Sequence, residues 1–146
     1  MIVSSSFPVL SLEEANALIP RIEDCLDRLM AHKEACDHHH DQLFFQELLE
    51  QAENKAGRAA DPLALENGFQ FLESLTVRME KEVARIRSLG GVLRDLDEGW
   101  VDFLGMWRGK VVFFCWKKGQ KQILYFHPLS APANARLPLG KPAREN

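Results

Sequence analysis

The spacing of apolar residues changes at Gly90-Gly91, and this change constrains the fold more than any other feature of the sequence. Before these glycines, apolar residues recur every three or four positions, as on one face of a helix. After them, apolar residues alternate with a period of two, which is typical of strands. The chain has 146 residues, of which 46% are hydrophobic, so it is the size of one domain. We therefore expect a single α+β domain over residues 1–146, in which a long antiparallel helical hairpin precedes a three- to four-stranded antiparallel β-meander.

The first helix is expected over residues 12–55. Ser11 precedes it and Glu14 follows three positions later, a spacing that predicts a capping box. Pro20 falls inside the helical pattern, where we expect a bend rather than an end, because proline lacks a backbone donor. One apolar stripe runs along this helix and is expected to pack against another helix: Ala15, Ile19, Ile22, Leu26 and Leu29.

The second helix is expected over residues 62–89. Asp61-Pro62 predicts its start, because an N-cap is followed there by proline at the first helical position. Gly90-Gly91 predicts a left-handed cap at its end. A short linker joins the two helices, which favours an antiparallel hairpin. The second stripe comprises Leu65, Phe69, Leu72, Met79, Val83 and Ile86.

The sheet is expected over residues 92–127, with strands near 92–96, 101–107, 111–117 and 122–127. Hairpin turns at Arg108-Gly109 and at 118–120 would pair Trp107 with Lys110 and Lys117 with Lys121. Alternation along these strands gives a first face that includes Val101, Phe103, Phe114 and Trp116 and a second face that includes Asp102, Cys115 and His127, and both faces are apolar. One helical hairpin covers one of them. We therefore expect a homodimer or a protein partner on the other face. The tail over residues 130–146 is expected to be extended.

The charge of the chain is divided unevenly around Asp102. Residues 1–102 contain 10 Lys/Arg and 20 Asp/Glu, a net −10, whereas residues 103–146 contain 8 and 1, a net +7. Acidic helices could lie beside a basic sheet, either within one molecule or in a partner copy, or the basic segment could bind a polyanion. We favour the first interpretation.

The three cysteines are an odd number, and Cys25 and Cys36 are eleven positions apart in the first helix. At about 1.5 Å per residue they lie roughly 16 Å apart, too far for a disulfide. Reduced thiols are typical of a cytoplasmic protein. We expect neither a signal peptide nor a membrane span, because no apolar run is long enough, and hence no membrane partner.

Several segments resemble one prokaryotic family in order along nearly the whole chain: Ser11–Asn16, Leu18–Pro20, Gly91–Leu96, Gly99–Phe103, Cys115–Lys117 and Tyr125–His127. The family is catalogued as domain of unknown function 2203. The resemblance implies a bacterial or archaeal cytosolic protein without an established activity. The chain departs from the family pattern at Leu104, Phe126 and Pro128. The last departure weakens any scheme in which a neighbouring carboxylate orients His127, because the family tends to place an acidic residue there.

A group of metal-binding residue types lies in the first helix: His32, Cys36, His38, His39 and His40. His32, Cys36 and His40 are spaced by one turn, so a helix face could offer two ligands to zinc. The second helix contains no Cys or His to complete the site, which favours a polar or pH-responsive helix face.

The acidic turn formed by Asp95, Asp97, Glu98 and Asp102 is a second candidate, with Cys115 and His127 nearby in the sheet. Such carboxylates bind magnesium or calcium, or act as general acids and bases, but Asp side chains also cap turns. The expected register places His127 near Val111, roughly 13 Å from Asp102. On that register the two residues cannot share a site.

The basic, aromatic strands could also bind single-stranded nucleic acid by stacking. However, the whole protein is acidic and no recognition motif is present, so the sequence does not favour nucleic acid.

The sequence favours a non-enzymatic interaction or assembly module that acts as a homo-oligomer. The alternatives are a metal-dependent enzyme that uses the acidic turn at 95–102, and a single-stranded nucleic-acid binder that uses the basic aromatic hairpin. We assign no catalytic residue, metal ligand or cofactor. The residues that we single out for ligand binding are Asp95, Asp97, Asp102, Cys115, Trp116 and His127.

Overall fold

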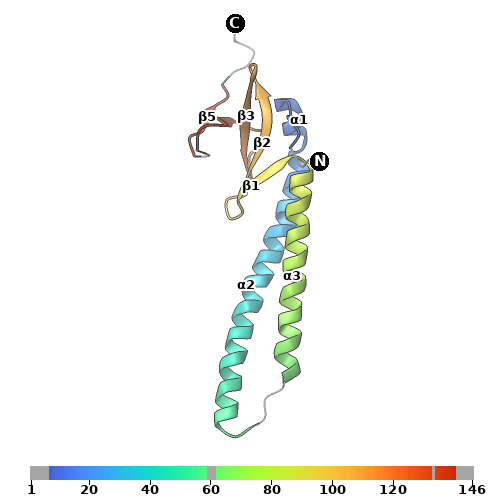
Figure 1. The fold of residues 1–146 in the computed structure, drawn as a ribbon, viewed down its shortest axis with the longest axis vertical. Helices are drawn as coiled ribbons and strands as arrows, with labels where there is room; N and C mark the ends of the chain where they lie inside the picture. The colour runs from blue at the N-terminus through green and yellow to red at the C-terminus, as the bar shows by residue number, and fades with distance from the viewer. Residues whose placement is uncertain (1–6, 59–61, 133, 141–146) are drawn as a thin grey trace, which may run out of the picture. The chain divides into compact units, whose positions relative to one another are not determined.

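The computed structural model describes residues 7–58, 62–132 and 134–140. It confirms the α+β class, with two long helices followed by an antiparallel sheet (Figure 1). The chain divides into two compact units: a helical unit, residues 28–82, and a sheet unit, formed by residues 1–27 with 83–146. The elements are α1 (Leu12–Ala17), α2 (Ile19–Lys55), α3 (Pro62–Ser88), β1 (Gly91–Asp95), β2 (Trp100–Trp107), β3 (Lys110–Lys117), β4 (Tyr125–Pro128) and β5 (Leu137–Pro138).

The capping box at the start of α1 is confirmed. Ser11 Oγ accepts from the Glu14 amide at 3.0 Å, and Glu14 Oε1 accepts from the Ser11 amide at 2.8 Å. The expected first helix is divided at Leu18, between α1 and α2. Pro20 then lies in the first turn of α2, where its missing backbone donor costs little. The proline therefore coincides with a break in the helix, where the sequence predicted a bend.

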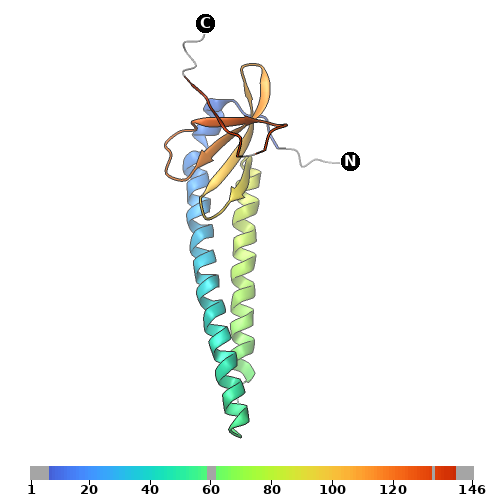
Figure 2. The same cartoon turned by 90° about the vertical axis from the view of Figure 1, so that its left-hand side faces the viewer.

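In the helical unit, α2 and α3 run antiparallel to each other (Figures 1 and 2). Arg28 Nε donates to the buried carboxylate of Glu82 at 2.9 Å. Phe69 lies on the predicted stripe of α3, yet it is 51% exposed. The predicted N-cap Asp61 lies outside the described residues. The buried apolar side chains of this unit include Leu29, Leu43, Leu72 and Leu75.

The sheet is a meander in the order β1-β2-β3-β4-β5, with each neighbouring pair antiparallel. The predicted turn at Arg108-Gly109 and the pairing of Trp107 with Lys110 are confirmed. Both turn residues have positive φ, 52° and 81°, as a two-residue type I′ hairpin requires. The fifth strand comes from the tail that was expected to be extended, and residues 141–146 of that tail lie outside the described part of the chain.

The predicted register between β3 and β4 is wrong by two residues. Lys117 does not pair with Lys121; the pairs are Cys115 with Tyr125 and Phe113 with His127. The loop between β3 and β4 is longer than predicted, because Ile123 lies in this loop and packs in the core instead of belonging to β4. Ile123 is 3% exposed, and its amide donates to Asn16 Oδ1 in α1 at 2.8 Å.

The first face of the sheet forms the core of the sheet unit. Val101, Phe103, Phe114 and Trp116 are completely buried. Helical side chains reach the edge of this face at Gly91: an added Cβ would lie 2.8 Å from Ile86 Cγ2, 2.9 Å from Val101 Cγ1 and 3.3 Å from Ile22 Cδ1.

Candidate functional site

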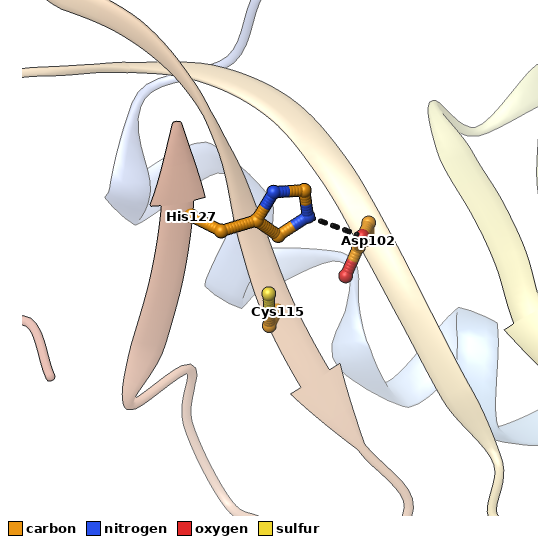
Figure 3. A group of neighbouring side chains, drawn as sticks. All are labelled: Asp102, Cys115 and His127. Carbon is orange, nitrogen blue, oxygen red and sulfur yellow. Dashed lines mark hydrogen bonds and ion pairs between the residues drawn. The ribbon is translucent and has the colours of Figure 1, made fainter. Parts of the chain in front are cut away.

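Three chemically reactive side chains meet on the second face of the sheet. Asp102 lies on β2, Cys115 on β3 and His127 on β4, and the three side chains point toward one another (Figure 3). Their ligand atoms all lie within 4.8 Å of one another. The side chains are 0%, 1% and 2% exposed, respectively. The arrangement is therefore a buried cluster assembled from three neighbouring strands.

The inference that Asp102 and His127 cannot share a site is wrong. Nε2 of His127 lies 3.0 Å from Oδ2 of Asp102. The physical reason is the two-residue register shift, which places His127 opposite Phe113 and thus diagonal to Cys115. A two-residue shift keeps every side chain on its predicted face but moves it about 6.6 Å along the strand.

Asp102 accepts hydrogen bonds from three side chains. Trp100 Nε1 donates to Oδ1 at 2.8 Å, and Arg94 Nε donates to Oδ2 at 2.8 Å. The third partner is His127. A buried carboxylate needs such partners, because its desolvation is costly. The carboxylate that orients His127 thus comes from β2, although the residue that follows the histidine is Pro128.

The imidazole of His127 has an oxygen next to each of its nitrogens. Nδ1 lies 3.0 Å from the Pro128 carbonyl oxygen, and Nε2 faces the Asp102 carboxylate. A carbonyl oxygen only accepts hydrogen bonds, so Nδ1 must carry a proton. Nε2 then satisfies the carboxylate only if it also carries a proton, or if another cation bridges the two atoms.

The thiol of Cys115 has a weak contact with the Phe113 carbonyl oxygen, at 3.9 Å. Burial raises the pKa of this thiol well above its usual range, and the negative charge of Asp102 raises it further. Without a bound cation, Cys115 is therefore a neutral thiol and a poor nucleophile.

The centre of the second face is not the open apolar surface that the sequence predicted, although Met106 and Val111 on this face are exposed. That centre is the Asp102–Cys115–His127 cluster, which this polypeptide itself shields from solvent. Cationic side chains lie over the aromatic rings around it: Arg94 is 5.0 Å from the Phe113 ring centroid, and Arg136 is 4.6 Å from that of Tyr125. The polar centre of this face therefore does not support an apolar contact with a partner there.

The other residues singled out from the sequence lie apart from the cluster. Oδ1 of Asp95 accepts from the Glu98 amide at 3.1 Å, as in a capped turn, and Asp97 is exposed. Trp116 is buried on the first face and donates to the Gln120 carbonyl oxygen at 2.8 Å. Among the described residues, Asp102, Cys115 and His127 form the one group with metal-binding geometry, so the residues from His32 to His40 do not form a second.

Sequence reasoning missed Arg94 and Trp100 as partners of Asp102. A usable signal was present, because strand alternation places Trp100 on the same face as Asp102. For the aromatic rings proposed to stack on nucleic acid, Phe114 and Trp116 are completely buried. Arg108 lies over the ring of Trp107 at 5.1 Å, so a cation of the chain already occupies one face of that ring.

Together, the fold and the cluster define an α+β protein with a helical hairpin and a buried Asp–Cys–His group on a meander sheet. The chain belongs to the family described as uncharacterized conserved protein (DUF2203), whose model matches residues 9–139. Comparison with curated proteins and with solved structures finds no match. Among the described residues, no helix combines the length and the apolar character needed to cross a membrane.

Proposed function

We propose that this protein is a non-enzymatic assembly module whose copies associate through the distal part of α2. The observation that carries the proposal is an exposed apolar surface, here named the distal stripe: Phe44, Phe45, Leu48 and Leu49. These side chains are 64%, 61%, 47% and 50% exposed.

The distal stripe lies on the exposed side of α2, and its members Phe45 and Leu49 also line a hollow beside Gly68 of α3. Leu43 is 4% exposed, and an added Cβ on Gly68 of α3 would clash with its side chain. At 100° per residue, the four stripe residues centre on the opposite side of the helix. A helix that is apolar on both sides is normally buried on both. The second side of α2 is therefore available for another chain.

The distal stripe is large enough to be part of an interface. Its four side chains are about half exposed or more and form an apolar patch of a few hundred Å², as many interaction sites do. Other exposed apolar side chains of the same unit lie on α3, outside the distal stripe: Leu63, Phe69, Phe71 and Val77.

A second copy of this chain offers a complementary surface. An apolar groove of about 690 Å³ in the sheet unit is lined by Trp107, Val112, Phe126 and Leu137 and is bordered by Arg108 and Lys110. Asp41 and Glu47 accompany the distal stripe on α2. An acidic apolar helix and a basic apolar groove complement each other in charge. Because each copy carries both surfaces, two copies can form a closed symmetric dimer with two equivalent contacts.

Sedimentation velocity tests the proposal. The wild-type protein is expected to sediment as a species of twice the 16.6 kDa chain mass at micromolar concentration. The double variant Phe45→Gln/Leu48→Gln is expected to be monomeric, whereas Val77→Gln, at an exposed apolar position of α3, remains dimeric. A monomeric wild-type protein at tens of micromolar would contradict self-association.

The salt dependence of the dimer tests the groove as the docking site. Contact between an acidic helix and a basic groove weakens as salt screens the charges, and Lys110→Glu is expected to weaken the dimer at low salt. If the stripe variant dissociates the dimer while Lys110→Glu and salt do not, two distal stripes pack against each other and the groove is not used.

A further inference from the structure

The Asp102–Cys115–His127 cluster combines the three donor types that bind borderline transition metals. It offers a carboxylate oxygen, a thiol sulfur and an imidazole nitrogen, all within 4.8 Å of one another. In a tetrahedral zinc site, ligand atoms lie about 3.3 to 3.8 Å apart, given metal–ligand distances of about 2.0 to 2.3 Å. The side chains therefore need to move little to close around one ion.

The hydrogen bonds around the cluster match those of metal ligands. Histidine ligands usually donate their second ring N–H to a carbonyl or carboxylate, which fixes the tautomer and aims the other nitrogen at the metal. Nδ1 of His127 is 3.0 Å from the Pro128 carbonyl oxygen, so Nε2 is aimed into the cluster. Trp100 and Arg94 hold the Asp102 carboxylate in place in the same way.

The three ligand atoms of the cluster face one another. Nε2 of His127 lies 3.0 Å from Oδ2 of Asp102, and a metal ion that binds both atoms takes the place of the proton between them. The sulfur of Cys115 is buried and lies 3.9 Å from the Phe113 carbonyl oxygen, a weak contact. A divalent ion satisfies all three atoms at once, because Asp102 and a thiolate at Cys115 balance its two charges.

We propose that Asp102, Cys115 and His127 bind one divalent transition-metal ion, and that zinc is the ion that suits them best. Zinc accepts nitrogen, sulfur and oxygen ligands together, whereas magnesium and calcium prefer oxygen alone. Three protein ligands leave a fourth coordination position for water or a small ligand. The site shares no residue with the distal stripe or with the groove that is proposed to receive it.

Cobalt binding to protein produced without a polyhistidine tag tests the proposal. Cobalt(II) bound to a thiolate absorbs in the near ultraviolet, which distinguishes Cys115 from adventitious binding to surface histidines. The wild-type protein is expected to bind one equivalent of cobalt with this absorption, and zinc is expected to displace it. Cys115→Ser is expected to lose the absorption and to bind cobalt more than roughly tenfold more weakly.

Cys36→Ser is the matched control, because Cys36 is the cysteine among the histidines of α2. This variant is expected to retain the absorption. The proposal is overturned if the wild-type protein shows no thiolate absorption, if the absorption survives in Cys115→Ser, or if it disappears in Cys36→Ser. If the wild-type protein shows no thiolate absorption, the cluster is a hydrogen-bonded ion pair instead.

X-ray absorption spectroscopy at the zinc edge of the wild-type protein identifies the ligand atoms directly. This test needs no variant, so misfolding cannot affect its result. One sulfur and two or three nitrogen or oxygen ligands are expected. A shell without sulfur, or with two or more sulfurs, would overturn the assignment.

Discussion

Oδ2 of Asp102 and Nε2 of His127 lie 3.0 Å apart inside the sheet unit, although 25 residues separate them in the chain. The two side chains are 0% and 2% exposed, and Arg94 donates to the same carboxylate oxygen. A buried carboxylate with two basic partners on one oxygen makes the second sheet face polar at its centre. The contact between Asp102 and His127 lies within the proposed metal site, and its loss should lower the stability of the metal-free protein.

We expect Asp102→Asn to destabilise the metal-free protein strongly. The substitution removes the charge that Arg94 and His127 share, and loss of one member of a buried ionic network typically costs about 3–5 kcal/mol. Urea unfolding measured by circular dichroism in the presence of a chelator checks this. Asp37→Asn is the matched control: its ion pair with Lys33 is exposed, so the change should cost less than about 1 kcal/mol. Equal losses of stability in Asp102→Asn and Asp37→Asn would contradict a buried ionic network at Asp102.

We expect Asn16→Ala to loosen the connection between β3 and β4. The Ile123 amide would lose its acceptor, Asn16 Oδ1, at a cost of about 1–3 kcal/mol for a buried unsatisfied donor. Hydrogen exchange at the Ile123 amide should become faster. Asn16→Asp keeps an oxygen acceptor and should retain most of the protection. Unchanged exchange in Asn16→Ala would show that this hydrogen bond does not hold the loop.

We expect Gly105→Ala to destabilise the sheet unit. An added Cβ would lie 2.6 Å from the Leu10 carbonyl oxygen and would clash with the ring of Phe114. Overpacking of this kind typically costs about 1–3 kcal/mol. Gly57→Ala is the comparison: its Cβ would meet no atom within 4 Å, and its cost arises from the positive φ of 80° alone. Thermal unfolding should show the larger loss for Gly105→Ala, and the reverse order would contradict this packing.

We expect Cys36 to react with alkylating reagents faster than the other two cysteines of the folded, metal-free protein. Cys25 and Cys115 are 3% and 1% exposed, whereas Cys36 is half-buried. Burial raises the pKa of Cys115 well above its usual range, so this thiol should stay neutral and unlabelled between pH 7 and pH 9. Mass spectrometry of the labelled peptides checks the order. Rapid labelling of Cys115 would contradict its burial.

Much of the fold could be predicted from local patterns. The capping residues Ser11 and Glu14 fixed the start of α1, and the change of period at Gly90-Gly91 fixed the boundary between helix and sheet. Two-residue alternation correctly placed Asp102, Cys115 and His127 on one face, because a shift by an even number of residues leaves the face unchanged.

The sequence by itself determined the helical hairpin, the antiparallel meander and the face on which each strand residue lies, because period and turn chemistry are local properties. Only the tertiary structure decided which residues of that face meet. The register of β4 is associated with a hydrogen bond from the Ile123 amide to Asn16, and these residues are 107 positions apart in the chain. Local alternation carries no information about such a contact. The position of His127 beside Asp102, and with it the candidate site, follows from that long-range packing.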